Sequence, residues 1–199
     1  MKVAGRLGEH DPQDGVLLTR MASGDEDAFT VLYRRRQAGV YRFVLHMCGS
    51  TAVAEEITQE VFLALIRDAK RTARQYDPGR GSFAAYLYGM ARHMALRHVE
   101  RDRRYVQLPD EEIAEGPGGS DPLADLTGAE RQALLQRAVL SLPPKYREVL
   151  LLCDIEEVSY AEAARMVGCE LGSVRSRLHR ARALLETKLR AARMEGCIP

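Results

Sequence analysis

The apolar residues of this chain recur at steps of three and four, and almost no stretch alternates with a period of two. Over residues 28–47 the recurring set is Phe29, Leu32, Tyr33, Val40, Phe43, Val44 and Met47. A second set predicts the inward face of a helix over residues 52–74: Ile57, Val61, Phe62, Leu65 and Ile66. This spacing is typical of packed helices, so we predict an all-α protein.

Proline and glycine interrupt the helical pattern and divide the chain. The stretch YDPGRGS at residues 76–82 ends the second helix, and Ser82 can cap a third. Residues 105–127 are rich in proline, glycine and acid, and too poor in apolar residues to build a core. We therefore predict a flexible tail (1–20), a helical domain (21–104), a flexible acidic linker (105–127) and a second helical domain (128–199).

The formal net charge is only +1, but the charges are segregated along the chain. Residues 105–130 hold seven acidic residues and no basic one, whereas residues 131–199 hold 12 basic against eight acidic residues. Such a layout concerns partners rather than the fold. The sequence contains no apolar run of membrane-spanning length and no apolar core of a secretory signal, so we expect a cytoplasmic protein without membrane insertion.

The sequence offers little support for catalysis or metal binding. Cys48, Cys153, Cys169 and Cys197 are far apart, which favours reduced, buried or incidental thiols over a metal site and leaves a redox role open. A Gly-rich phosphate loop and the spacing of a catalytic triad are both absent from the sequence. We expect no metal, no cofactor and no enzymatic activity.

The segment from Ser159 to about residue 185 has the pattern of a helix–turn–helix motif. Ser159 and Glu162 have the spacing of a capping box, and Gly168 stands where a left-handed residue ends a helix. The next helix opens at Gly172 and Ser173 and has one apolar stripe: Val174, Leu178, Ala181 and Leu185. In this motif the second helix enters a DNA major groove.

Arginines concentrate on that second helix. Ser176, His179 and Arg180 lie opposite its apolar stripe, while Arg175, Arg177 and Arg182 flank it. Residues near the helix start that face away from the core reach base edges, and flanking arginines suit phosphates. The alternative is the solvated face of an ordinary amphipathic helix, but few acidic residues balance these arginines, which favours a polyanion as partner.

Two parts of the chain, in order, resemble the extracytoplasmic-function (ECF) class of bacterial RNA polymerase sigma factors. LSLPPKYREVLLLCDIEEVSYAEAARMVGCELGSVRSRLHRARALL is similar to region 4 of this family. AEEITQEVFLALIR resembles region 2.2, and YDPGRGSFAAYLYGMARHMALRHVERDRR resembles regions 2.3 and 2.4. The resemblance implies a region 2 helical bundle and a region 4 helix–turn–helix domain, in a subunit that directs promoter-specific initiation.

The resemblance also implies DNA-binding residues. Region 4 recognises the upstream (−35) promoter element, which implies contacts by Ser173, Arg175, Ser176, Arg177, His179, Arg180 and Arg182. Regions 2.3 and 2.4 melt and capture the −10 element, which implies contacts by Tyr76, Arg80, Ser82, Phe83, Tyr86, Arg92, His93, Arg97 and Arg101. Core packing is the competing interpretation for Phe83 and Tyr86. Tyr86 and His93 depart from the usual Trp and Asn of the family, which leaves the promoter preference open.

The partners that the resemblance implies are core RNA polymerase, promoter DNA and an anti-sigma factor. Region 2.2 would dock on the clamp helices of the largest polymerase subunit through Glu56, Gln59, Glu60 and Leu63, although plain solvation of the carboxylates is an alternative. Region 4 would also contact the flap of the second-largest subunit. The linker would follow the RNA path of the polymerase or serve as a solubilising tether.

A second hypothesis is a stand-alone helix–turn–helix regulator that binds its operator without polymerase. Such a protein would bind as a dimer, and the sequence shows neither a dimer seam nor the signature of a ligand pocket. Co-purification with core polymerase would favour the sigma factor, and operator binding by the chain alone would favour the regulator.

Overall fold

The computed structural model describes residues 12–105 and 128–196, and all regular structure in these two ranges is helical. The prediction of an all-α protein is confirmed. The α-helices are α1 (Pro12–Ala22), α2 (Glu26–Cys48), α3 (Thr51–Arg67), α4 (Ala69–Gln75), α5 (Phe83–Tyr105), α6 (Gly128–Leu140), α7 (Pro144–Leu150), α8 (Tyr160–Val167) and α9 (Leu171–Gly196). Two short elements are a 3₁₀-helix, η1 (Pro78–Arg80), and a π-helical turn, η2 (Leu151–Ile155).

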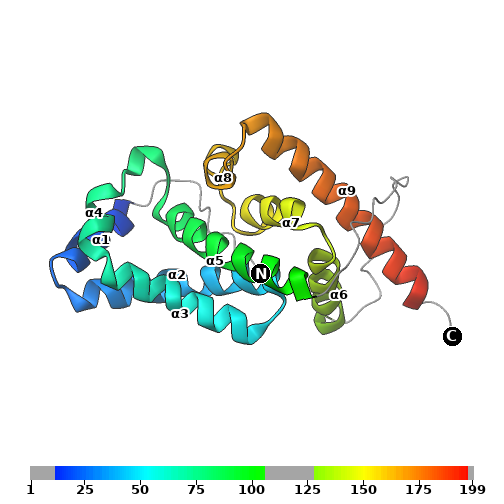
Figure 1. The fold of residues 1–199 in the computed structure, drawn as a ribbon, viewed down its shortest axis with the longest axis horizontal. Helices are drawn as coiled ribbons and strands as arrows, with labels where there is room; N and C mark the ends of the chain where they lie inside the picture. Colours follow the sequence, from blue (N-terminus) through cyan, green and yellow to red (C-terminus); the bar gives the residue numbers. More distant parts are fainter. Residues whose placement is uncertain (1–11, 106–127, 197–199) are drawn as a thin grey trace.

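Helix α2 is the centre of the first domain and packs against α1, α3 and α5 (Figure 1). Asp25 caps its start by accepting a hydrogen bond from the Ala28 N–H. Gly49 ends it with φ of 77°, a left-handed conformation in which its N–H donates to the Leu45 carbonyl. The predicted inward residues Val40, Phe43, Val44 and Met47 are all buried.

Helix α1 lies within the segment that we predicted as a flexible tail, so that prediction is wrong for residues 12–20. Leu17, Leu18 and Met21 are buried. Asp14 accepts hydrogen bonds from Arg35 Nη1 at 2.6 Å and Arg36 Nε at 2.7 Å, which fasten α1 to α2. An eleven-residue helix with few apolar positions gives a weak periodic signal, and its stability comes from these tertiary contacts. Residues 1–11 lie outside the described part of the chain.

The buried face of α3 differs from the prediction at one position. Ile57, Val61, Phe62 and Leu65 are inward as expected, but the Ile66 residue is 46% exposed. One residue rotates an α-helix by about 100°, so Ile66 points away from the face that Leu65 buries.

The second domain consists of α6 to α9, with η2 continuing directly from α7. The capping box at Ser159 and Glu162 is present, and Gly168 ends α8 with φ of 72°, so both predictions are confirmed. The buried Arg147 donates hydrogen bonds to the carbonyls of Leu140, Leu142 and Met47. Because Met47 belongs to α2, this arginine also contacts the first domain.

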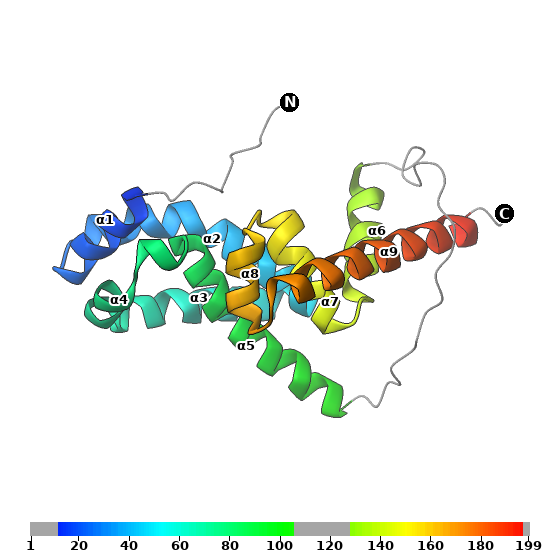
Figure 2. The same cartoon turned by 90° about the horizontal axis from the view of Figure 1, so that it is seen from above.

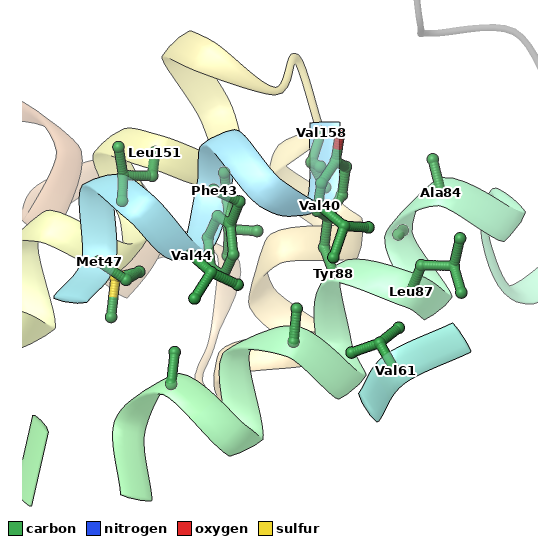
Figure 3. Packing of buried hydrophobic residues seen from close by; sticks show 14 of the residues in the cluster. Val40, Phe43, Val44, Met47, Val61, Ala84, Leu87, Tyr88, Leu151 and Val158 are labelled. Atoms are coloured by element: carbon green, nitrogen blue, oxygen red, sulfur yellow. The ribbon is translucent and has the colours of Figure 1, made fainter. Parts of the chain in front are cut away.

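The two domains share one continuous apolar core. Helix α2 contacts α6, α7 and η2, and α5 contacts α8 (Figure 2). Leu151 and Val158 of the second domain lie with Val40 and Phe43 of α2 in this cluster (Figure 3). The domain boundaries stay a prediction, since most of the predicted linker, residues 106–127, lies outside the described part of the chain.

The described cysteines, Cys48, Cys153 and Cys169, are free and partly buried, and Cys197 lies outside the described residues. Burial, with the nearby Asp154 carboxylate, raises the pKa of Cys153 to about 11.

We predict that Cys153 reacts slowly with iodoacetamide in the native protein, because roughly one thiol in three thousand is ionised at pH 7.5 with such a pKa. Peptide mass spectrometry after timed alkylation measures the rate, and the same thiol in urea-unfolded protein is the control. Equal rates in both states would contradict the described burial.

A second prediction concerns the buried guanidinium of Arg147. Arg147→Met removes the donor of three buried carbonyls, so we expect the free energy of unfolding to fall by about 2–4 kcal/mol. Arg137 of α6 is exposed, and Arg137→Met is the matched control, with an expected change of about 0.5 kcal/mol or less. Urea titrations followed by circular dichroism test both variants, and equal midpoints would refute the structural role of Arg147.

Candidate nucleic-acid interface

Helices α8 and α9 form the predicted helix–turn–helix. The apolar stripe of α9 is buried at Val174, Leu178 and Ala181, and it packs with the small buried residues Ala163 and Ala164 of α8. Leu185, further along, is partly buried. Small side chains at this crossing allow the two helices to approach closely. The packing fixes which face of α9 points outward.

The outward face of α9 carries Arg175, Ser176, His179 and Arg180, all exposed, whereas Ser173 and Arg177 are partly buried. A hollow of about 480 Å³ beside this face is lined by Ser176, Arg177, His179 and Arg180 together with Lys145 and Tyr146 of α7. Guanidinium, ammonium, imidazole and hydroxyl groups converge there. Such a set suits phosphate oxygens and base edges.

The sequence analysis did not include Lys145 and Tyr146. They precede the recognition helix by about thirty residues, and only the packing of α7 against α9 brings them to its exposed face. The Lys145 ammonium lies 5.1 Å from the centre of the Tyr146 ring. A basic residue beside an aromatic one in PPKYRE is the available sequence signal, and it is weak by itself.

Arg182 is engaged within the second domain. Its guanidinium donates to both carboxylate oxygens of Asp154, with Nε–Oδ2 at 2.8 Å and Nη2–Oδ1 at 2.6 Å. The Asp154 carboxylate raises the pKa of Arg182, which therefore stays charged. The pair joins α9 to η2, so Arg182 differs from the four outward residues.

The predicted −10 residues of the first domain begin with an aromatic cluster. The Tyr76 and Phe83 rings meet edge-on at 5.4 Å, and the Phe83 and Tyr86 rings stack at 5.9 Å between centroids. Phe83 is 2% exposed and Tyr86 is 37% exposed. The geometry thus favours core packing for Phe83, which supports two more accessible tyrosines.

A cavity of about 600 Å³ adjoins this cluster and brings together five predicted residues: Tyr76, Arg80, Ser82, Tyr86 and His93. Glu162 and Arg165 of α8 line its opposite side. The Ser82 Oγ accepts from the Ala85 N–H at 3.2 Å, which confirms Ser82 as the cap of α5.

The Ser82 N–H donates to Glu162 Oε1 at 2.6 Å, which links the two sides of the cavity. Burial would raise the pKa of Glu162, but the hydrogen bonds from Ser159 and Ser82 outweigh it and hold the pKa below its usual value of 4.5. This contact is complete above the ordinary pKa and weakens as the pH falls through the lowered value.

The other predicted −10 residues lie outside the cavity. Arg92 is largely buried and donates to Glu148 Oε2 of α7 at 2.8 Å. Arg97 and Arg101 are exposed further along α5, where that helix projects from the rest of the molecule (Figure 2). The structure therefore gathers five of the nine predicted residues and leaves these arginines apart.

The predicted polymerase-docking residues share one exposed face of α3: Glu56, Gln59, Glu60 and Leu63. Leu63 is 54% exposed, and the neighbouring Ile66 extends the same apolar strip. Exposed leucine and isoleucine among carboxylates are typical of a contact surface.

Within the described residues no group of three or more His, Cys, Asp or Glu side chains could hold a metal ion. No described helix is long and apolar enough to cross a membrane.

Comparisons with known proteins cover both domains. Residues 32–105 match the family model "Sigma-70 region 2", and residues 132–185 match "Sigma-70, region 4". Among solved structures, CnrH in complex with the cytosolic domain of CnrY matches 94% of this chain and 99% of its own, with a TM-score of 0.65 and 22% identity. RpoE of Bartonella quintana in complex with the anti-sigma factor NepR matches 81% of this chain and 96% of its own, with a TM-score of 0.59 and 23% identity. These likenesses show the fold.

Curated relatives are similar along most of the chain. SigE of Mycolicibacterium smegmatis, an ECF RNA polymerase sigma factor, is 36% identical over 177 residues, which is 84% of this chain and 65% of that protein. SigW of Bacillus subtilis, also an ECF sigma factor, is 28% identical over 87% of this chain and 95% of its own length. The sigma-H factor of Pseudomonas aeruginosa is 30% identical over 89% of this chain and 94% of its own length. With both family regions matched in order and relatives aligned across both domains, the chain belongs to the ECF class of the sigma-70 family of RNA polymerase sigma factors.

Proposed function

We propose that this chain acts in the cytoplasm as a dissociable subunit that gives core RNA polymerase its promoter specificity. Sigma factors are initiation factors and not enzymes, and the work of this chain is binding. The observation that supports a specific role at promoters is the exposed cationic face of α9 beside the hollow that Lys145 and Tyr146 line. Start-site selection by core polymerase after addition of the purified chain tests the function directly.

At the −35 element, α9 enters the major groove of duplex DNA. Arg175 and Arg180 are long enough to reach base edges, where a guanidinium binds guanine through two hydrogen bonds. Ser176 and His179 donate to or accept from the neighbouring bases. Arg177 and Lys145 stand at the border of this face and bind backbone phosphates, which position the helix.

At the −10 element, the cavity beside α5 receives an unstacked base of the opened strand. Tyr86 offers one exposed ring face, and Tyr76 lines the same cavity. Taking a base out of the stack costs a few kcal/mol, and stacking on a side chain returns about 1–3 kcal/mol. Arg80 is exposed at the rim and binds the adjacent phosphate, while His93 contacts the base or its sugar.

The exposed face of α3 docks on the clamp helices of the largest polymerase subunit. Leu63 and Ile66 supply apolar contact area, and Glu56, Gln59 and Glu60 supply polar and charged partners around it. Region 4 contacts the flap of the second-largest subunit. A stand-alone regulator is not favoured, because the first domain matches sigma region 2 rather than a sensor domain.

An anti-sigma factor regulates this chain in our proposal. Both solved relatives with the same fold were captured with such a partner or with a cytosolic domain bound to them. The identity of the regulator and the inducing signal follow from neither the fold nor the sequence.

The first functional prediction concerns the outward arginines of α9. We expect Arg175→Ala or Arg180→Ala to lower run-off transcription from the cognate promoter by about 10–100-fold, because each removes a contact worth about 1–3 kcal/mol. The melting temperature should stay unchanged, since both side chains are exposed. Arg71→Ala, on the exposed surface of α4, is the control. Full transcription with both α9 variants would refute their role in recognition.

The second functional prediction separates positioning from recognition. Lys145→Ala should weaken holoenzyme binding to promoter fragments equally for all −35 sequences and reduce the salt dependence of log K by about one unit, as for one lost phosphate contact. Arg175→Ala should instead change the preference among −35 sequences. Fluorescence anisotropy at several salt concentrations measures both. A sequence-dependent loss or an unchanged slope for Lys145→Ala would contradict a phosphate contact.

A further inference from the structure

A carboxylate of the second domain is buried between two helices of the first. Glu156, just after η2, is 1% exposed. Arg42 of α2 donates to both of its oxygens, with Nε–Oε1 at 2.8 Å and Nη2–Oε2 at 2.7 Å. The Tyr88 hydroxyl of α5 donates to Oε2 at 2.5 Å. Burial and the Glu156 charge raise the pKa of Tyr88, so its hydroxyl remains protonated and available as a donor.

The space for this carboxylate depends on Gly39 in the middle of α2. A Cβ atom there would lie 2.5 Å from the Tyr88 hydroxyl oxygen and 3.3 Å from Glu156 Oε2. On the side of the second domain, Glu157 has φ of 53°, a strained conformation for a residue with a side chain. Both chains of the contact are thus shaped to admit Glu156.

Other contacts across the same interface involve the candidate −10 surface. Glu148 of α7 holds Arg92 at 2.8 Å, and its other oxygen lies 3.9 Å from Arg177 of α9. Glu162 of α8 accepts from the backbone of Ser82. Helix α8 therefore borders the cavity that gathers the −10 residues, and two of the predicted contacts are occupied by carboxylates.

We infer that Glu156 is a latch that holds the polymerase-free chain closed, with α8 over the −10 surface. The buried charge is stable only while Arg42 and Tyr88 surround it, which fixes how the two domains meet. Arg42 keeps 46% of its side chain exposed, so water reaches the ion pair from one side and the contact is reversible. Opening is then a step that binding to core polymerase drives. The assignment of the −10 surface rests on the proposed function, whereas the closure does not.

The test compares two opening variants with matched controls. Glu156→Gln removes the charge at nearly constant size, and Gly39→Ala inserts a methyl group from the other domain. Glu55→Gln on the exposed surface of α3 makes the same charge change, and Gly89→Ala adds a methyl group that meets no neighbouring atom within 4 Å. Small-angle scattering of the free full-length chain measures compactness, and circular dichroism confirms helical content.

We expect a larger radius of gyration for both opening variants and unchanged values for both controls. The affinity of Glu156→Gln for a single-stranded −10 oligonucleotide, relative to Glu55→Gln, should rise by about five- to tenfold. Opening variants as compact as the wild type would overturn the latch, and opening without a gain in oligonucleotide affinity would overturn the covering of the −10 surface. Failure of the wild type to start transcription with core polymerase would instead refute the proposed function, since scattering needs no polymerase.

Discussion

Helix α2 is buried on two sides, and the arrangement of the whole molecule depends on this. One side packs against α3 and α5, and the other packs against α7 and η2 of the second domain. Val40, Phe43, Val44 and Met47 are each 1% exposed or less. An apolar helix surface of this width cannot be covered by one small bundle, because a helix in contact with a single layer buries only one stripe. Region 4 covers the remainder, and one core results (Figure 3).

Polar contacts then determine the geometry of an interface that apolar packing alone would leave variable. Arg147 reaches across to the Met47 carbonyl, Glu156 enters between α2 and α5, and Glu162 accepts from Ser82. Each of these buried groups needs a partner at a fixed distance, so a shift of either domain leaves an unpaired charge or carbonyl. Gly49 adds a steric condition, because a Cβ there would lie 2.9 Å from a methyl group of Leu140.

Local patterns predicted the parts of this structure that local interactions determine. The capping box of α8, the left-handed Gly168 and the apolar stripe of α9 involve residues within a few positions of each other, and all three were predictable. Partners distant in sequence were not. Arg42 and Glu156 are 114 positions apart, and neither residue differs in sequence context from an ordinary surface charge. For the same reason the sequence did not distinguish Arg182, bound to Asp154, from the exposed Arg180.

The pairing of Glu148 shows how the closed arrangement and DNA binding are alternatives. This single carboxylate lies near one arginine from each candidate DNA surface, Arg92 at 2.8 Å and Arg177 at 3.9 Å. A carboxylate offers a guanidinium the same charge and bidentate acceptor geometry as a phosphate. Glu148 therefore occupies positions that backbone phosphates would take, and separation of the domains frees both cations together. Closed and DNA-bound states thus compete for the same guanidinium groups, which couples the geometry of the interface to promoter binding.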